Sequence, residues 1–509
     1  MPGLATVSNR NTGVVATMAA AAVVSIYWYN CHQRTRCCST TIIVPCYRVP
    51  ISLWRAVIAM AGDNVAGQLL EWRRAQLNKT TASDTVAANN VLWVPLPLWG
   101  GGLYIIGDAQ LQREILLDPT TEKDDMYDSF AKVTSGLSVF SRRTADPHWK
   151  VLRKGAAPAF ATAPMERMHT ICRRHVEEWI STRLSSEEGV TVIIDPSYEL
   201  TRLTMRIILD GSFEYTVTTD EEANEFLYEL NLAMQEFVVL QSTNPLRGLY
   251  GQYVHAATRR AHVAADRLRA FARKVLESYR RKRQENEAVL STESTLIRLI
   301  ETNPRLSEDD KLSEIVTYIV AGHDTTGYTL ANTLFLIAQH SSVMEKVATA
   351  QTDPNTLAPY TQWCLWESFR LEPVVATGVP RITGRDFFRD THCSTSEQRQ
   401  SLRIPAHRTV LIAPLLCHRD PAVFAQPDAY LPERWESISS SEQSRLLHTF
   451  LLGKRNCIGQ SLAKTELQVV LARVLSDYTV QVQDLGAMRE VLTWHHHGGS
   501  LRFTRRRRR

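Results

Sequence analysis

The strongest chemical signal in this chain of 509 residues is the segment FLLGKRNCIG, which contains Cys457. Gly453 and Gly459 permit tight turns close to a flat ligand, and an apolar-periodic run over residues 460–475 predicts a helix directly after the cysteine. The positive end of that helix and the adjacent Lys454 are expected to favour the thiolate, which is the form that binds a metal ion. A cysteine taken alone is more often a buried structural residue, so other patterns must decide between the two roles.

A second pattern, AGHDTT, lies inside a long apolar stretch that predicts a helix over Leu312–His340. Gly322 costs about 1 kcal/mol in a helix relative to alanine, and close approach of a ligand is one reason for it. Ala321 and Thr325 share one helix face, where a small side chain leaves room for dioxygen beside a hydroxyl that can relay a proton. Asp324 would complete an acid–alcohol pair. The alternative is a bent helix whose threonine hydroxyls bond backbone carbonyls.

Two further patterns combine charged residues with helical spacing. Glu367 and Arg370 lie three apart in a helix expected over residues 362–371, so their side chains can pair, although an isolated surface pair is worth little. The segment DPHWKVLR predicts a capped helix start that places Trp149 and Arg153 on one face. A surface arginine whose stem covers apolar neighbours is the alternative for Arg153.

Together these patterns resemble the signatures of the cytochrome P450 superfamily. FLLGKRNCIG has every fixed position of that family's haem-binding pattern F-x-x-G-x-R-x-C-x-G, and ESFR is similar to its E-x-x-R, with PERW at residues 432–435 similar to the segment that completes it. AGHDTT resembles the family's oxygen-activation segment, and WKVLR its W-x-x-x-R. The patterns follow the family's order, and the resemblance covers residues 102–502.

The resemblance implies a haem b (iron protoporphyrin IX) cofactor whose axial ligand is the Cys457 thiolate. It implies further cofactor contacts, of which the last rests on a weak match, from Arg455, Phe450, Gly453, Gly459, Trp149, Arg153 and Arg381. Asp324 and Thr325 would be the catalytic pair that delivers protons. A structural role, in locking the core beside the haem, falls to Glu367, Arg370 and Arg434.

Helical periodicity dominates the rest of the chain, so the fold class is mostly α with a minor β part. Helices are expected at Ala109–Leu117, Glu222–Leu240 and Ala256–Gln284, besides those given above, and strands at Leu103–Ile106, Val190–Ile194 and Thr409–Leu415. No linker or internal repeat divides the chain. We therefore expect one large haem domain of the cytochrome P450 fold over residues 61–504.

Composition excludes several classes of protein. Hydrophobic residues make up 44% and charged residues 22% of the chain, which suits a large folded core rather than disorder. The net charge of +5 equals that of the five arginines at 505–509, so the body is neutral and lacks the broad basic face that nucleic acid requires. The nine cysteines are too sparse for a disulfide framework and indicate a reducing compartment.

The amino-terminal region predicts a membrane anchor. After a short segment of residues 1–12, residues 13–29 are uncharged and end in three aromatic residues. Arg34 and Arg36 follow at the start of the connector of residues 30–60. This pattern favours a single-pass anchor in the endoplasmic reticulum membrane with the catalytic domain in the cytosol. A cleaved signal peptide and an organelle transit peptide are the alternatives, the latter pointing to a plastid or mitochondrial membrane.

The predicted activity is a haem-thiolate monooxygenase that inserts one oxygen atom from O2 into a hydrophobic substrate such as a fatty acid, sterol or terpenoid. Electrons would come from NADPH-cytochrome P450 reductase or a similar donor, steered by Lys150, Lys154 and Lys454. One alternative is an O2-independent isomerase, dehydratase or peroxygenase acting on lipid hydroperoxides, which Thr325 argues against. A more remote one is a haem-binding membrane protein without catalysis.

Some segments depart from the family pattern or fit no role. Residues 385–403, with Cys393, look like a surface insertion, and residues 44–90 match no pattern. The tract His495–His497 resembles a metal site, but neighbouring strand residues point to opposite faces, so surface exposure is expected, with contact to substrate as the alternative. The arginine tail is expected to be solvated, with anionic lipid or a receptor as alternative partners.

Overall fold

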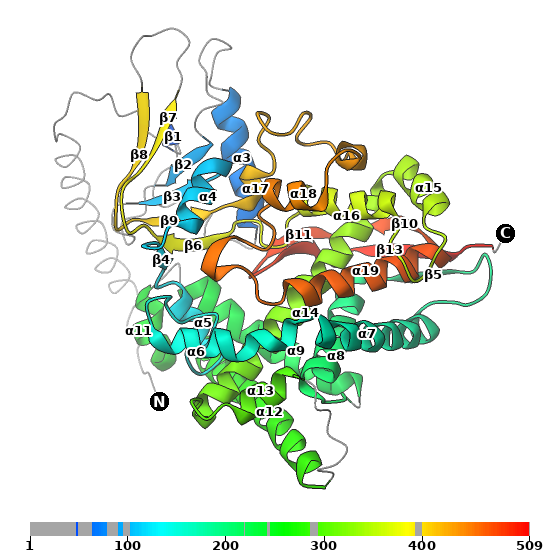
Figure 1. Ribbon diagram of the computed structural model, residues 1–509, viewed down its shortest axis with the longest axis horizontal. Coiled ribbons are helices and arrows are strands. Elements are labelled where there is room, and N and C mark those ends of the chain that lie inside the picture. Colours follow the sequence, from blue (N-terminus) through cyan, green and yellow to red (C-terminus); the bar gives the residue numbers. More distant parts are fainter. Residues whose placement is uncertain are drawn as a thin grey trace, which may run out of the picture.

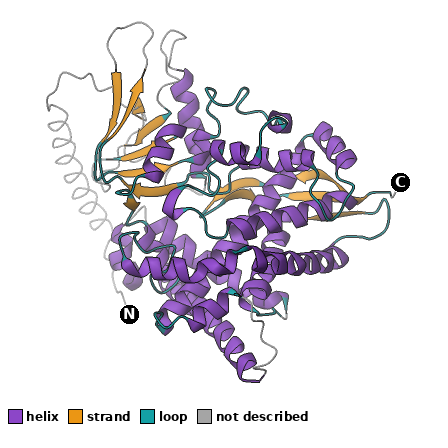
Figure 2. Ribbon diagram, viewed as in Figure 1, coloured by secondary structure: helices purple, strands orange, loops and turns teal. Residues whose placement is uncertain are grey.

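The computed structural model describes residues 47–48, 64–78, 90–94, 102–217, 219–241, 245–285, 294–391 and 400–507. Within them helices form most of the molecule and strands a smaller part, which confirms the predicted class (Figure 2). None of the helices in these ranges is long and apolar enough to cross a membrane. The predicted anchor over residues 13–29, and Cys393, lie outside the described residues.

The long helix α14, Glu308–Gln339, runs through the middle of the helical body (Figure 1). It packs against α8 (Pro196–Phe213), α12 (Ala256–Glu285), α16 (Pro359–Leu371) and α19 (Gln460–Asp477). It begins four residues before the predicted start because Ser307 and Asp310 form a capping box ahead of the apolar run.

The other helices surround this centre or join it to the sheets. They are α3 (Val65–Asn78), α4 (Ala109–Leu117), α5 (Tyr127–Val133), α6 (Pro147–Ala156), η2 (Ala157–Phe160), α7 (Thr162–Arg183), α9 (Asp220–Met234), the π-helical η3 (Gln235–Leu240), α11 (Pro245–Val254), α13 (Leu296–Thr302), α15 (Ser341–Ala350), α17 (Pro414–Cys417), η4 (Pro432–Trp435), α18 (Ser440–Leu446) and η5 (Gly453–Arg455). The predicted helix at Ala109–Leu117 is confirmed to the residue. The run predicted as one helix at Glu222–Leu240 is instead α9 followed by η3.

Four sheets are present in the described part of the chain. The largest has the order β1-β2-β3-β9-β6-β4, and the others are β10-β13-β5, β11-β12 and β7-β8. The strands are β1 (Tyr47–Arg48), β2 (Val91–Val94), β3 (Leu103–Ile106), β4 (Glu122–Lys123), β5 (Thr191–Ile194), β6 (Val379–Ile382), β7 (Phe387–Thr391), β8 (Gln400–Ile404), β9 (Thr409–Ile412), β10 (Tyr478–Asp484), β11 (Ala487–Glu490), β12 (Trp494–His497) and β13 (Ser500–Arg505). Figure 1 shows the six-stranded sheet at one side of the helical body, beside α3 and α4.

One predicted strand needs correction, and the predicted insertion has a defined structure at its base. The strand predicted at Thr409–Leu415 ends at Ile412, because Pro414 begins the short helix α17. The segment interpreted as a surface insertion contains the antiparallel hairpin β7–β8, and Phe387, Leu402 and Ile404 are buried in a core cluster. The hairpin is therefore packed into the sheet region at its base.

Candidate active site

The loop that carries Cys457 lies between η5 and α19. The Cys457 N–H donates to the Phe450 carbonyl at 2.8 Å and closes the loop. Gly453 has a φ of +72°, and a Cβ there would lie 2.7 Å from the Leu116 carbonyl oxygen, so this turn requires glycine. Gly459 lies in the turn that leads into α19, with φ −84° and ψ 12°, so the predicted turn is present but its conformation does not require glycine. A Cβ at Gly459 would instead lie 4.0 Å from the Cys457 sulfur.

Cys457 is accessible although protein atoms surround its side chain. Burial raises the pKa of its thiol, while the Gly459 N–H and the Arg153 guanidinium lower this pKa in part. Lys454 is exposed and the Arg455 guanidinium bonds to residues of the 139–144 loop. Desolvation of the thiol therefore opposes the stabilisation of the thiolate that the local charges were expected to provide.

The middle of α14 also carries an accessible residue among buried ones. Residues 311–320 are all buried, and the next residue, Ala321, is exposed although the helix lies in the centre of the body. One turn earlier, the Tyr318 ring packs 6.2 Å from that of Phe160, whose edge lies 3.9 Å from the Cβ position of Gly459. This series of contacts brings α14 alongside the Cys457 loop.

A cluster of buried cations lies beside the same loop. The Arg455 side chain donates to Thr144 Oγ1 at 2.8 Å and to the Val139 carbonyl at 3.0 Å, and Arg381 donates to Tyr127 Oη at 3.1 Å. Burial, with Arg381 and Arg455 nearby, holds the pKa of Lys123 well below its usual value. Burial also lowers the pKa of Arg455 to about 10.

These cations are short of negative charge. Glu122 acts on the pKa values of both Lys123 and Arg455, but its carboxylate accepts the backbone N–H groups of residues 123, 144 and 145. The indole Nε1 of Trp149 is buried without a hydrogen-bond partner among the described residues, and the Arg455 guanidinium lies 4.1 Å from its ring. Arg153 reaches Asn456 Oδ1 at 2.6 Å, next to the cysteine. A flat ligand with two carboxylates and a metal centre facing Cys457 fits this arrangement, as haem does.

The predicted structural triad is assembled in the interior. Arg370 donates through Nε at 2.9 Å and Nη2 at 2.8 Å to the two oxygens of Glu367, and Arg434 Nε donates to Oε1 at 3.0 Å. Trp435 Nε1 donates to Oε2 at 2.9 Å. Trp435 thus adds a further donor to this buried carboxylate. Phe369, within the same helix, packs edge-on against Phe450 at 6.1 Å and joins this network to the Cys457 loop.

The structure assigns different surroundings to each residue of AGHDTT. Thr325 Oγ1 donates to the Ala321 carbonyl at 2.8 Å, so the alternative of back-bonded threonines applies to this side chain. Asp324 Oδ2 accepts the Thr493 hydroxyl at 2.8 Å, and burial raises the pKa of the carboxyl. A Cβ at Gly322 would lie 2.1 Å from Ile208 Cδ1, so close packing against α8 explains this glycine without a ligand.

The expected exposure of the histidine tract is wrong for two of its three members. His495 is 7% exposed and stacks on Tyr328 with ring centroids 3.6 Å apart, and His496 is 5% exposed and stacks on Phe335 at 4.2 Å. His497 is exposed. No group of three or more metal-binding side chains occurs in the part of the chain that the structure describes.

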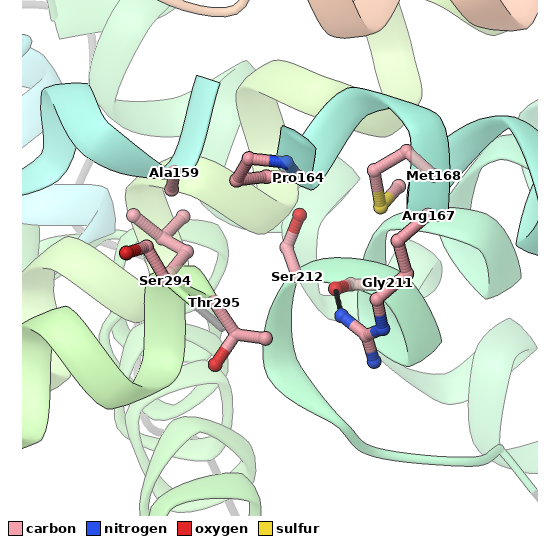
Figure 3. A pocket seen from close by; sticks show the side chains of 9 residues that line it. Ala159, Pro164, Arg167, Met168, Gly211, Ser212, Ser294 and Thr295 are labelled. Atoms are coloured by element: carbon pink, nitrogen blue, oxygen red, sulfur yellow. Dashed lines mark hydrogen bonds between the residues drawn. The ribbon is translucent and has the colours of Figure 1, made fainter. Parts of the chain in front are cut away.

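A small hollow between α7, α8 and the start of α13 is separate from the Cys457 loop (Figure 3). Its walls include Arg167, Met168, Ser212 and Thr295, and it is partly open to solvent. It contains none of the residues singled out by the sequence patterns. Sequence reasoning missed two residues of the site itself, Lys123 and Thr493, because neither belongs to a recognisable pattern.

Comparison with known proteins agrees with this geometry. The family model described as Cytochrome P450 matches residues 100–503, so the chain belongs to the cytochrome P450 family. The chain is 27% identical to cyclooctatin synthase of Streptomyces melanosporofaciens, covering 83% of this chain and 89% of that protein. It is 24% identical to trichothecene C-4 hydroxylase of Trichoderma arundinaceum, with 85% of each covered, and 25% identical to the human ultra-long-chain fatty acid omega-hydroxylase, with 71% and 70% covered. Its enzyme class is that of a cytochrome P450 monooxygenase.

Replacing Trp435 with phenylalanine removes one donor from the buried Glu367 carboxylate. We expect the free energy of unfolding to fall by about 1.5–3 kcal/mol, the usual worth of a hydrogen bond to a charged group. Urea titration followed by circular dichroism measures it. Trp366→Phe is the matched control, since Trp366 packs edge-on against Trp435 at 6.1 Å, and a loss of equal size in both variants would contradict the assignment.

Glu314 on α14 predicts a pH dependence of stability. Burial raises its pKa to about 8, and its Oε1 accepts the Val139 N–H at 2.6 Å. Because the folded protein holds this proton more tightly than the unfolded chain, Glu314 costs stability increasingly as pH rises from its unfolded pKa through about 8. Glu314→Gln keeps the acceptor and should match the wild-type melting temperature near pH 5 but exceed it near pH 9. Parallel curves would show that Glu314 does not titrate in this range.

Proposed function

We propose that the protein is a haem b-dependent monooxygenase that inserts one oxygen atom of O2 into a hydrophobic small molecule, with Cys457 as the axial ligand. One observation carries this proposal. Cys457 and Ala321 of α14 are both solvent-accessible within the body of the protein, and a cluster of cations lies beside the Cys457 loop. The differing substrates in the relatives' names leave the hydrophobic class broad, and fatty acids, sterols and terpenoids are all candidates.

The side chains around the loop would hold the cofactor in a fixed orientation. The Cys457 N–H bond to Phe450 sets the position of the sulfur. Arg455, Arg381 and Lys123 would pair with the two carboxylates of the cofactor, and this pairing would offset the cost of burying these cations. Trp149 Nε1 would find its missing acceptor there, with Arg153 on the side of Asn456.

Haem, when bound by a thiolate, supplies the activation of dioxygen. The chain's own part in the chemistry would be to handle protons. The Thr325 hydroxyl hydrogen is directed at the Ala321 carbonyl, which leaves the oxygen lone pairs of Thr325 to accept. Asp324 keeps its proton to a higher pH than an exposed carboxyl, because burial raises its pKa, and can therefore serve as the proton source.

We propose a diflavin reductase that uses NADPH, or a similar donor with an acidic surface, as the electron source. Lys150 and Lys154 on α6 and Lys454 in η5 are all exposed. Arg153, on the same helix, contacts Asn456, so these lysines lie on the side of the molecule next to Cys457. From the sequence alone we further propose that residues 13–29 anchor the protein in the endoplasmic reticulum membrane, with plastid or mitochondrial membranes as the alternative.

Thr325→Ala should uncouple electron use from product formation, because the hydroxyl that relays the proton is lost. We expect NADPH consumption to continue while hydrogen peroxide replaces most of the product. The measurement is the ratio of product to NADPH oxidised with a substrate found by spectral titration. Thr333→Val, which removes a buried hydroxyl bonded to the Thr329 carbonyl on the same helix, is the control. Coupling that survives in Thr325→Ala would favour an O2-independent reaction instead.

Reversing two exposed charges, Lys154→Glu with Lys454→Glu, should slow reductase-supported turnover. The effect should be larger at low ionic strength, because salt screens the attraction between the partners. Stopped-flow reduction rates at two salt concentrations measure this. Lys282→Glu, at the far end of α12, changes the net charge without touching this surface. Equal slowing by this control would show that the effect is not local.

A further inference from the structure

The hairpin β11–β12 lies along α14 and contacts it at successive turns. Thr493, in the turn before β12, bonds Asp324; the next contacts along the helix are the His495 ring on Tyr328, Asn332 Nδ2 on the Trp494 carbonyl at 3.0 Å and the His496 ring on Phe335. The hairpin is also held from outside, since Glu490 accepts the backbone N–H groups of Ala66 and Thr377. Its position against α14 is thus fixed at both ends.

Among the described residues of this hairpin, Thr493 is the one that forms a hydrogen bond with Asp324 of α14. Thr493 is buried, with 2% of the residue exposed, and its hydroxyl donates to Asp324 Oδ2 at 2.8 Å. The other groups that face this carboxyl are His323 on its own helix and Tyr328 one turn later, with Arg202 of α8 acting on both. His323 Nδ1 is engaged with the Ile319 carbonyl at 2.7 Å. The described residues therefore give Asp324 a neutral hydroxyl as its hydrogen-bond partner instead of a cation.

We propose that Thr493 is the positioning residue for Asp324, whose hydroxyl fixes one carboxyl oxygen and leaves the other to carry the transferable proton. This inference rests on the proposed role of Asp324 and Thr325 and deepens it. A threonine hydroxyl that donates to Oδ2 occupies that oxygen, so the proton of the carboxylic acid resides on Oδ1. The side chain is held in a single orientation next to Thr325, and the hydrogen bond stabilises the ionised form after the proton leaves.

The burial of Asp324 determines how the Thr493 hydrogen bond affects its pKa. Burial raises the pKa of Asp324, and His323 and then the Thr493 hydrogen bond lower it in part. Without the hydroxyl the acid would hold its proton more tightly and would be free to rotate. Proton delivery would then slow while electrons continue to arrive, and the excess would appear as peroxide.

Thr493→Val tests the proposal because valine keeps the shape and removes the hydroxyl. Thr493→Ser keeps the hydroxyl, and Thr333→Val is the control for loss of a buried hydroxyl that does not face Asp324. We expect the ratio of peroxide to product to rise about twofold to tenfold in the valine variant, the range that one hydrogen bond supports, and to stay near wild type in the other two.

A second readout needs no turnover. The infrared carbonyl band of protonated Asp324, identified by its loss in Asp324→Asn, is followed against pH in the resting protein. Its titration midpoint should move to higher pH in Thr493→Val and stay in place in Thr493→Ser. If the valine variant does not accumulate, Thr493→Ala against Thr493→Ser makes the same comparison.

The outcomes separate this inference from the proposed function. If Asp324→Asn leaves coupling intact, the proposed proton role of Asp324 is wrong, and Thr493 falls with it. If Asp324→Asn uncouples the reaction while Thr493→Val changes neither coupling nor the titration midpoint, Asp324 acts without Thr493 and only this inference is overturned. If Thr493→Val and Thr493→Ser both uncouple the reaction, Thr493 has a packing role, and the inference is likewise overturned.

Discussion

A surplus of positive charge inside the protein is the constraint on which the site depends. Lys123, Arg381 and Arg455 are gathered beside the Cys457 loop, and burial lowers the pKa values of Lys123 and Arg455. Such a cluster is costly unless an anion offsets it. A haem group fits this site, since its carboxylates can pair with the cations and its iron can bind the Cys457 sulfur. The cofactor would therefore stabilise the protein as well as supply its chemistry.

Contacts elsewhere in the fold hold the elements of that site in position. The Glu367–Arg370 pair, closed by Arg434 and Trp435, holds α16 against η4, and the Phe369–Phe450 contact extends this network to the Cys457 loop. On the opposite side, α14 is fixed along its length by α8 and by the β11–β12 hairpin. Gly322 leaves room for Ile208 of α8, directly beside the exposed Ala321.

Much of this arrangement could be predicted from the sequence, because short patterns with fixed spacing determine local geometry. Helix α4, strand β3 and the Glu367 pairing follow from periodicity alone. The roles of Lys123 and Thr493 could not be predicted, since their partners are distant in the chain and no spacing connects them. The burial of His495 and His496 was missed for the same reason: their environment comes from Tyr328 and Phe335 on α14. The desolvation of the Cys457 thiol could not be predicted either, because it comes from tertiary packing rather than from the adjacent helix terminus.

The most direct test of the account is the reduced-plus-carbon-monoxide difference spectrum of the purified protein, expressed with sufficient haem precursor. If the Cys457 thiolate holds the haem, the spectrum shows the strongly red-shifted absorption band that is characteristic of thiolate-ligated haem, and Cys457→Ser loses it. A protein that folds but binds no haem would contradict the central claim. So would a red-shifted band that persists after Cys457 is replaced, because another residue would then be the ligand.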